Sequence, residues 1–267
     1  MAGYAVWRIC TTGFSETAWI MFAMMWAVNI LSITVAYHRY MTHGAFKCSP
    51  ATEKFLYAMA AVALQGNGIF WGEAHWRHHV CQDVEGDPHR PSEYGGGLLG
   101  FLWAHIGWMC FEMKPPPPDY RTPLQFRKSI GLQWQKRWYW AFALLGGFGV
   151  PYLVAGWNGV LLAGFLRLAL CWNLAWGVNS FCHVVGTHAE DSSGKTLETR
   201  RARNFPLWCL FWILAFLSGG EYWHANHHAR QRSAHLGWRW WEIDPGGWVV
   251  AIAQRIGLFQ NVETPNI

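Results

Sequence analysis

The sequence predicts an all-α fold, an integral-membrane helical bundle of about three spanning helices with a histidine-rich cap on its cytoplasmic side. Of the 267 residues, 52% are hydrophobic and only 14% are charged, whereas a soluble domain usually carries roughly 25% charged residues. The 20 tryptophans point the same way, because indole rings collect where a membrane meets water. The length suits one domain, and we expect residues 1–267 to form a single one.

Three long apolar segments are the candidates for spanning helices. Residues 18–37, 138–157 and 160–181 each supply about the 20 residues that a helix needs to cross the hydrocarbon layer. Only Asn158 and Gly159 separate the second segment from the third. We therefore expect these two segments to form a helical hairpin.

Two shorter apolar stretches, residues 55–64 and 207–217, cannot cross a bilayer and are expected to form re-entrant or interfacial helices. Each of them leads directly into a cluster of histidines. Arg167 lies inside the third candidate span. It requires polar partners or a cavity there, because an unpaired charge in hydrocarbon is costly.

Basic residues are concentrated on one side of the predicted spans. Apart from Arg8 and Arg167, the other 19 of the 21 lysines and arginines lie in residues 38–137 and 182–267. The positive-inside rule makes that face cytoplasmic and places the N-terminus outside. We expect a multi-pass protein of a bacterial inner membrane rather than of the endoplasmic reticulum, with its histidine clusters on the cytoplasmic side.

Eight of the 13 histidines fall into three tight clusters next to these segments. The clusters are His38 with His43, then His75 with His78 and His79, then His224 with His227 and His228. Positions i, i+3 and i+4 share one face of a helix, so each triplet presents its three imidazoles together. Two identical triplets and a pair are typical of metal ligands rather than of isolated structural histidines.

Asn179 and His183 add a further pair, four residues apart at the cytoplasmic end of the third candidate span. With His183 the histidines number nine, which is too many for one ion and suits two. Imidazole binds zinc, copper, iron or nickel, so the ligand type leaves the metal open. The basic residues flank apolar spans instead of forming one stripe, which argues against nucleic-acid binding.

These motifs, in their order along the chain, resemble those of the integral-membrane acyl-CoA fatty-acid desaturases of the stearoyl-CoA type. The resemblance covers residues 18–260 and includes the Gly-Asp-Pro-His run at 86–89 and the His-Ile-Gly-Trp run at 105–108. It implies that two iron ions and O2 introduce a double bond into a fatty acyl chain. The implied ligands are His38, His43, His75, His78, His79, His183, His224, His227 and His228, with Asn179 contacting iron through water.

The resemblance also implies partners. The acyl chain is expected as a thioester of coenzyme A or of an acyl carrier protein, within membrane lipid. The family usually carries an Arg-Pro-Tyr run where this chain has residues 187–190 (Thr-His-Ala-Glu), so an intact lipid stays open as a third carrier. The sequence has no haem or iron–sulfur motif, so we expect a separate electron donor of the cytochrome b5 or ferredoxin type.

Three bulky side chains are candidates for contact with the acyl chain. Trp71 lies one helical turn before His75 and resembles a family position that lines the acyl tunnel. Trp26 and Ile30 share a face of the first span, two to three turns deeper than His38. They could plug a tunnel and so select chains shorter than stearoyl; the alternative is that they face lipid or pack against neighbouring helices.

Carboxylates near the clusters are candidates for orienting metal-bound imidazoles. Those close enough in sequence are Glu73, Asp83, Glu85, Asp87 and Glu221. Four histidines lie outside the clusters, and we expect them to have supporting or structural roles rather than to bind metal. They are His89, His105, His188 and His235.

Two other functions fit the pattern less closely. A membrane di-iron hydroxylase or acetylenase would use the same oxidant, and its product would distinguish it from a desaturase. A metal transporter should hold its ligands near the middle of the membrane, in broken helices. Here the ligands lie at the cytoplasmic ends of the predicted helices, which disfavours transport.

Overall fold

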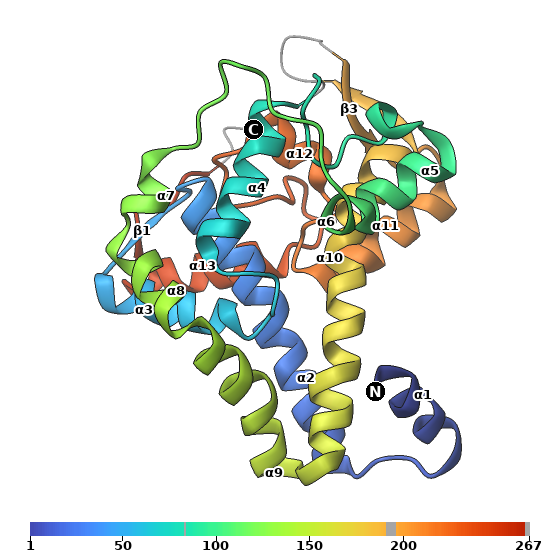
Figure 1. Cartoon of the computed structure of the whole chain (residues 1–267), viewed down its shortest axis with the longest axis vertical. Coiled ribbons are helices and arrows are strands. Elements are labelled where there is room, and N and C mark those ends of the chain that lie inside the picture. Colours follow the sequence, from blue (N-terminus) through green and yellow to red (C-terminus); the bar gives the residue numbers. More distant parts are fainter. Residues whose placement is uncertain (83, 191–195, 265–267) are drawn as a thin grey trace.

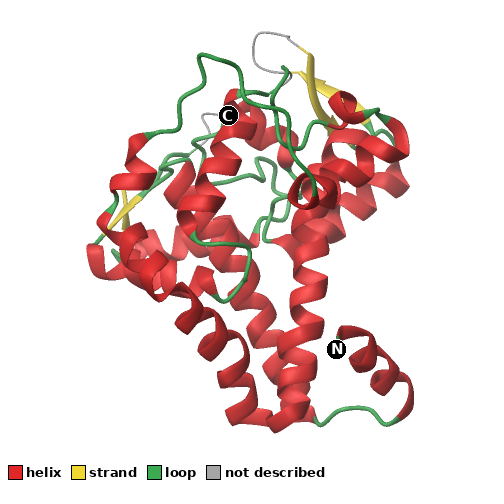
Figure 2. Ribbon diagram, viewed as in Figure 1, coloured by secondary structure: helices red, strands yellow, loops and turns green. Residues whose placement is uncertain are grey.

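The computed structural model describes residues 1–82, 84–190 and 196–264, and helices dominate it (Figures 1 and 2). The first half contains α1 (Ala2–Thr11), α2 (Glu16–Leu31), η1 (Ser32–Thr42), α3 (Pro50–Ala61), α4 (Gly68–Val80), η2 (Pro91–Tyr94), α5 (Gly97–Leu102), η3 (Trp103–Gly107), α6 (Trp108–Cys110) and α7 (Leu124–Lys128). The second half contains α8 (Ile130–Ala141), η4 (Phe142–Gly149), α9 (Val150–Gly159), η5 (Val160–Leu166), α10 (Arg167–Val184), α11 (Phe205–Ser218), α12 (His224–Ala229) and α13 (Pro245–Arg255). The strands are β1 (Lys47–Cys48), β2 (Thr187–Glu190), β3 (Thr196–Arg201) and β4 (Phe259–Gln260).

Two helical stretches are long and apolar enough to cross a membrane. The first joins α2 to the π-helical η1 over Glu16–Thr42, with a mean hydropathy of 1.8. Ser15 begins it, because its hydroxyl accepts the N–H of Ala18 and satisfies one of the free donors of the first turn. The second stretch, Ile130–Val184, has a mean hydropathy of 1.6 and runs from α8 to α10.

The second stretch is folded back on itself. Ala155 and Gly156 have non-helical backbone angles, and Gly156 adopts a left-handed φ of 56° that costs glycine little. Figure 1 shows the chain reversing direction between α9 and α10. The sequence predicts the hairpin turn at Asn158 and Gly159. In the structure the turn comes earlier, at Ala155 and Gly156. Two apolar stretches, one of them bent, replace the three separate segments, and the three-span membrane bundle stays a prediction.

Helices α3 and α4 begin at side-chain caps. The hydroxyl of Ser49 accepts the N–H of Thr52 at the start of α3, and the side chain of Asn67 accepts two N–H groups at the start of α4. Gly219 ends α11 with a φ of 74°, the left-handed conformation usual after a helix. With 12 and 14 residues, α3 and α11 are too short to span.

Two small antiparallel sheets depart from the all-α prediction. Strand β1 pairs with β4, so Lys47 faces Gln260, and β2 pairs with β3. The first pairing joins positions more than 200 residues apart, and both of its strands have only two residues. A period of hydrophobicity cannot be read in segments of that length, so only the tertiary structure reveals them.

A buried ion pair fixes the C-terminal region against the first long helix. Nη2 of Arg39 lies 2.7 Å from Oδ1 of Asp244, and both side chains are at most 4% exposed. Arg39 also donates to the carbonyl oxygens of Gly219 and Ala234. These bonds hold the end of α11 and the segment before α13 against Arg39, which is the neighbour of His38 in the chain.

Candidate metal centre

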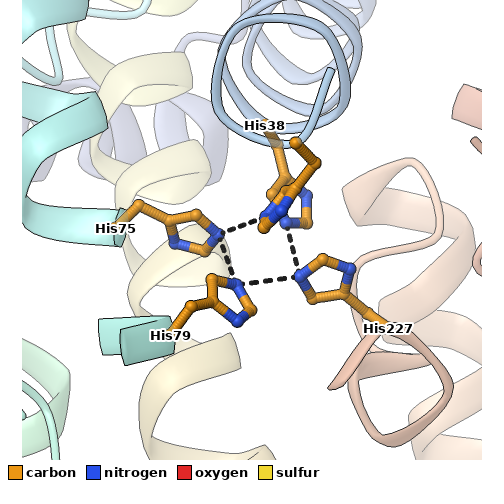
Figure 3. A group of neighbouring side chains, drawn as sticks. His38, His75, His79 and His227 are labelled. Carbon is orange, nitrogen blue, oxygen red and sulfur yellow. Dashed lines mark hydrogen bonds between the residues drawn. The ribbon is translucent and has the colours of Figure 1, made fainter. Parts of the chain in front are cut away.

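Five histidines from η1, its C-terminal end, α4 and α12 converge in a group that we call the first cluster (Figure 3). Nε2 of His227 lies 3.0 Å from Nε2 of both His38 and His79. Nε2 of His75 lies 3.0 Å from that of His79 and 3.2 Å from that of His43. One ring nitrogen from each of the five lies within 4.8 Å of the others.

A second cluster of four histidines comes from α4, α10 and α12. Nε2 of His228 lies 3.1 Å from that of His78 and 2.9 Å from that of His224. Nε2 of His183 lies 3.2 Å from that of His224. Helices α4 and α12 thus contribute ligands to both clusters.

The spacing of these nitrogens fits metal coordination. A metal–imidazole bond is about 2.1 Å long, so adjacent ligands of an octahedral ion lie about 3 Å apart and opposite ligands about 4.2 Å apart. The measured separations of 2.9–3.2 Å match the adjacent value. Each cluster could therefore hold one ion and still leave positions for exchangeable ligands.

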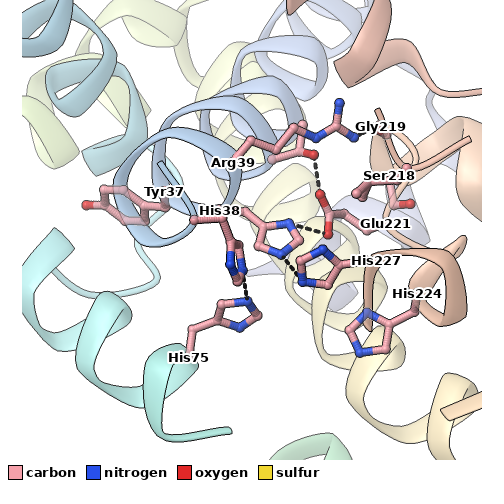
Figure 4. Close-up of polar contacts among 12 residues, drawn as sticks. Tyr37, His38, Arg39, His75, Ser218, Gly219, Glu221, His224 and His227 are labelled. Atoms are coloured by element: carbon pink, nitrogen blue, oxygen red, sulfur yellow. Dashed lines mark hydrogen bonds and ion pairs between the residues drawn. The ribbon is translucent and has the colours of Figure 1, made fainter. Parts of the chain in front are cut away.

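Carboxylates orient one imidazole in each cluster. Nδ1 of His38 lies 2.7 Å from Oε2 of Glu221, whose other oxygen accepts the hydroxyl of Thr34 (Figure 4). Nδ1 of His78 lies 2.9 Å from both oxygens of Asp87, which is 2% exposed. A carboxylate on Nδ1 keeps the proton there and leaves Nε2 free to bind a metal.

Burial keeps the imidazoles in the form that binds metal. It lowers the pKa of the buried rings well below the ordinary value, and repulsion between neighbouring rings lowers it further. The rings concerned are His75, His79, His224, His227 and His228. Neutral imidazole is the ligating species, so these rings need not lose a proton before an ion enters.

An apolar cavity of about 290 Å³ adjoins both clusters. It lies among α4, α6 and α10 and reaches His38 and His75 of the first cluster and His224 of the second. Most of its remaining wall is aromatic or aliphatic, including Ile33, Leu64, Trp71, Trp108, Trp172 and Trp176. A chain of methylene groups suits such a wall, because it offers few hydrogen-bonding groups.

The structure brings the predicted ligands together. All nine histidines lie in the two clusters, with His183 in the second. Asn179, one turn earlier on α10, lines the cavity beside His224. The motifs identified by their spacing thus lie together in space, although their division into groups of five and four could not be read from the sequence.

The three substrate residues expected from the sequence lie in different surroundings. Trp71 lines the cavity, and its ring stacks on His75 with centroids 4.7 Å apart. Trp26 and Ile30 do not line it. The indole N–H of Trp26 donates to the carbonyl of Leu217, and Ile30 is buried in the core between α2, α10 and α11.

Two of the other carboxylates near the histidine motifs pair with basic side chains. Oε1 of Glu73 accepts Nε of Arg127 at 2.6 Å. Oε1 of Glu85 lies 3.5 Å from Nζ of Lys114. Asp83 lies outside the described residues. Of the candidates for orienting an imidazole, Asp87 and Glu221 therefore fill that role.

Histidines outside the predicted motifs have supporting positions. His89 is buried beside the second cluster, with its ring centroid 4.8 Å from that of His78, and it lines the cavity. Nδ1 of His105 lies 3.0 Å from the hydroxyl of Ser180 and joins η3 to α10. Neither cluster includes His188 or His235.

Several residues that line the cavity were not identified as substrate-binding residues in the sequence analysis. Leu64 has a φ of 52°, which is unusual for a residue with a side chain. Trp172 lies two helical turns before Asn179 on the same helix, so that spacing could have identified it. Trp108 ends a motif noted for its resemblance alone. Met109, which follows it, belongs to no motif.

Two buried histidine clusters beside an apolar cavity define a helical protein able to hold two metal ions next to an oily substrate. Comparison with known proteins identifies its relatives. The family model described as fatty acid desaturase matches residues 17–253. The chain belongs to the fatty acid desaturase family, and it is an oxidoreductase of the fatty acyl desaturase class.

Curated relatives within this family differ in the carrier that their names give. The chain is 32% identical over 253 residues to the hex-5-enoyl-[acyl-carrier protein] acetylenase of Moorena producens (strain JHB), with 90% of this chain and 75% of the relative covered. It is 31% identical to the sn-1 stearoyl-lipid 9-desaturase of Anabaena variabilis, with coverage of 90% and 81%. It is 29% identical to the acyl-CoA C20 Delta5-desaturase of Anemone leveillei, with coverage of 94% and 75%.

Proposed function

We propose that this protein is an oxygen-dependent di-iron desaturase that introduces a double bond into a fatty acyl chain. The observation that carries the proposal is the contact of one apolar cavity with both histidine clusters, through His38 and His75 on one side and His224 on the other. An acyl methylene in this cavity lies beside both metal positions. Removing hydrogen from such a methylene needs an oxidant that side chains do not supply, and iron with O2 supplies it.

The proposed iron ligands are the residues of the two clusters. Five belong to the first ion and four to the second. They are His38, His43, His75, His79 and His227, then His78, His183, His224 and His228. We propose that Asn179, on the cavity wall, contacts one iron through a water molecule.

The residues of the cavity bind and position the substrate. The rings of Trp71, Trp172 and Trp176 form walls that exclude water and restrict the acyl chain to an extended path past the clusters. Asp87 holds the proton on Nδ1 of His78, and Glu221 lies in ion-pair contact with Nδ1 of His38, so both rings are oriented before the substrate enters.

The acyl carrier, the electron donor and the membrane arrangement are parts of the same proposal. Relatives are named for acyl-carrier-protein, lipid and CoA substrates, so a thioester or a lipid ester can present the chain. Electrons come from a separate protein of the cytochrome b5 or ferredoxin type. Residues 1–267 form one domain, anchored in a bacterial inner membrane by three spans, with the clusters on the cytoplasmic side.

Mass spectrometry of lipids and thioesters tests the activity. Cells that express the protein should contain an unsaturated acyl chain that is missing from cells expressing a His78→Ala, His227→Ala double variant. The class of molecule in which the new double bond first accumulates identifies the carrier. Wild-type protein that binds iron and O2 but yields no new unsaturated, acetylenic or hydroxylated chain in any lipid or thioester pool contradicts the proposal.

An acetylenase is the second candidate, because one relative at 32% identity bears that name. An acetylenase removes two further hydrogens from an existing double bond, so it needs a monounsaturated substrate. Feeding saturated and monounsaturated chains of equal length separates the two activities: a desaturase acts on the first and an acetylenase on the second. A hydroxylated product from either chain favours the hydroxylase.

A further inference from the structure

The segment between α3 and α4, residues 62–67, forms one wall of the acyl cavity, and we call it the connector. Its residues 64–66 line the cavity. Trp172, which contacts the same cavity, precedes Asn179 by two turns of α10, or about 10 Å along the helix. The connector therefore walls the cavity beside Trp172, whose indole donates to Ala63 two turns of α10 before Asn179. Leu64 holds a left-handed φ of 52° there.

Non-helical backbone inside an apolar bundle needs hydrogen-bond partners, and the connector obtains them from side chains of other helices. The carbonyl of Val62 accepts from Nη1 of Arg167 at 3.0 Å, and that of Ala63 accepts from Nε1 of Trp172 at 2.8 Å. Further along, the N–H and the carbonyl of Gly66 bond to the hydroxyl groups of two tyrosines. The course of the connector is thus set by its neighbours.

Arg167 is the charged member of this set, and it is fully buried. Its guanidinium donates to Oδ1 of Asn29 at 2.6 Å and to the carbonyls of Val62, Ala163 and Gly147 at 3.0, 2.9 and 3.3 Å. All four acceptors are neutral, and among the described residues no carboxylate pairs with it. The planar fork of donors thus joins α2, the connector and both arms of the hairpin at fixed angles.

The electrostatics favour the same arrangement. Val62 is the C-cap of α3, and the C-terminus of a helix carries a partial negative charge together with carbonyls that have no partner within the helix. A buried positive charge is stabilised at that place. Two residues further on, the chain adopts a left-handed conformation at Leu64, which lines the cavity.

We propose that Arg167 is a positioning residue for acyl-chain selectivity, which holds the connector and thereby fixes where the acyl cavity is walled. The proposal about binding rests on the cavity alone; its extension to the position of the double bond rests on the proposed desaturase function. One methylene more or less in an apolar pocket changes selectivity by roughly tenfold or more, so a small movement of this wall has a measurable effect.

The first test measures binding and does not depend on turnover. Purified wild-type protein, in one fixed detergent, is mixed with saturated fatty acids of increasing length, and the shift of its thermal midpoint is recorded. We expect a sharp length cut-off. Arg167→Met has a similar length but no donors, and it should blur that cut-off by roughly tenfold in the ratio of affinities for adjacent lengths. Arg167→Lys, which keeps the charge, should retain more of the cut-off.

The matched control is Arg8→Met. Arg8 is also hydrogen-bonded, to Asn158 and to the carbonyl of Gly13, but it contacts neither the connector nor the cavity. Its replacement should leave the cut-off in place. Asn29→Ala provides a second route, because it removes the acceptor 2.6 Å from Nη1 of Arg167, and Asn29 does not line the cavity. If Arg167→Met does not accumulate in cells, this second variant tests whether Arg167 positions the connector.

The second test compares products. In cells that express Arg167→Met, we expect a broader range of chain lengths or double-bond positions than wild-type cells give, at unchanged metal content. A wild-type cut-off in folded Arg167→Met, or in Asn29→Ala where the arginine variant fails to fold, overturns the proposal. If wild-type protein shows the length cut-off but makes no oxidised chain, the proposed function is wrong. The role of Arg167 is then decided by the binding test alone.

Discussion

Nδ1 of His78 lies 2.9 Å from both carboxylate oxygens of Asp87, and both side chains are buried. The carboxylate also accepts the backbone N–H of His89, which ties the loop after α4 to the second cluster. Asp87 therefore connects the orientation of a proposed metal ligand with the position of the loop that lines the cavity.

Asp87→Asn should weaken metal binding to the second cluster by roughly 10- to 100-fold. The amide cannot hold the Nδ1 proton of His78 as a carboxylate does, so the ring loses its fixed tautomer. Competition with a chelator, followed by metal analysis of the protein, measures the change. Glu85→Gln is the control, since that side chain is 78% exposed and only pairs with Lys114. Equal metal affinity in both variants would count against the orienting role.

His78→Ala and His227→Ala should each lower the metal content from two ions towards one, because they remove ligands of different clusters. The double variant should lose both ions and all desaturation. Elemental analysis of purified protein checks the stoichiometry. His188→Ala is the control, since this exposed residue on β2 lies outside both clusters. Two retained ions with full turnover in both single variants would exclude the ligand assignment.

Trp71→Ala should change the chain-length profile and reduce turnover, because the ring lines the cavity and stacks on His75. Trp26→Ala tests the plug that the sequence suggested. Trp26 packs beside α11 and donates to Leu217 outside the cavity, so its loss should lower stability and leave the profile unchanged. Product analysis of both variants decides: a profile that moves with Trp26 alone would restore the plug.

Reporter fusions at the two ends test the membrane arrangement. The proposed three spans, together with the concentration of basic residues in 38–137 and 182–267, predict the N-terminus outside and the C-terminus in the cytoplasm. A reporter active only outside should respond at the N-terminus, and one active only inside should respond at the C-terminus. Both ends on the cytoplasmic side would mean that an even number of spans crosses the membrane.

The sequence allowed a more detailed prediction of the histidine motifs than of the helices that surround them. The i, i+3, i+4 spacing put the histidines of each triplet on one side of a helix, and the structure brings all nine into two clusters. Within α4, however, His75 and His79 join the first cluster while His78 joins the second. That division depends on how α10 and α12 approach α4, which spacing within one helix cannot reveal.

The prediction was weaker where the structure depends on one turn residue or on contacts between distant segments. The hairpin turns within α9, at Ala155 and Gly156, because Gly156 supplies the left-handed residue. The sequence predicts the turn at the Asn-Gly pair that follows. The sheet of β1 and β4 depends on contacts between positions more than 200 residues apart. The acyl wall near Leu64 depends on side chains of other helices, chiefly Arg167 and Trp172. Arg167 was expected to need partners; Ala163 and Gly147 lie on its own predicted hairpin, whereas Asn29 and Val62 lie on segments that the sequence could not place beside it.

The sharing of α4 and α12 between the clusters has a consequence for assembly. An ion bound in the first cluster would hold His75 and His227 in place and thereby fix the relative position of the two helices. The same constraint would keep His78 beside His228 in the second cluster. The first ion therefore does part of the ordering that the second would otherwise require. Metal uptake by the empty protein should be cooperative, with few singly loaded molecules at intermediate metal concentrations.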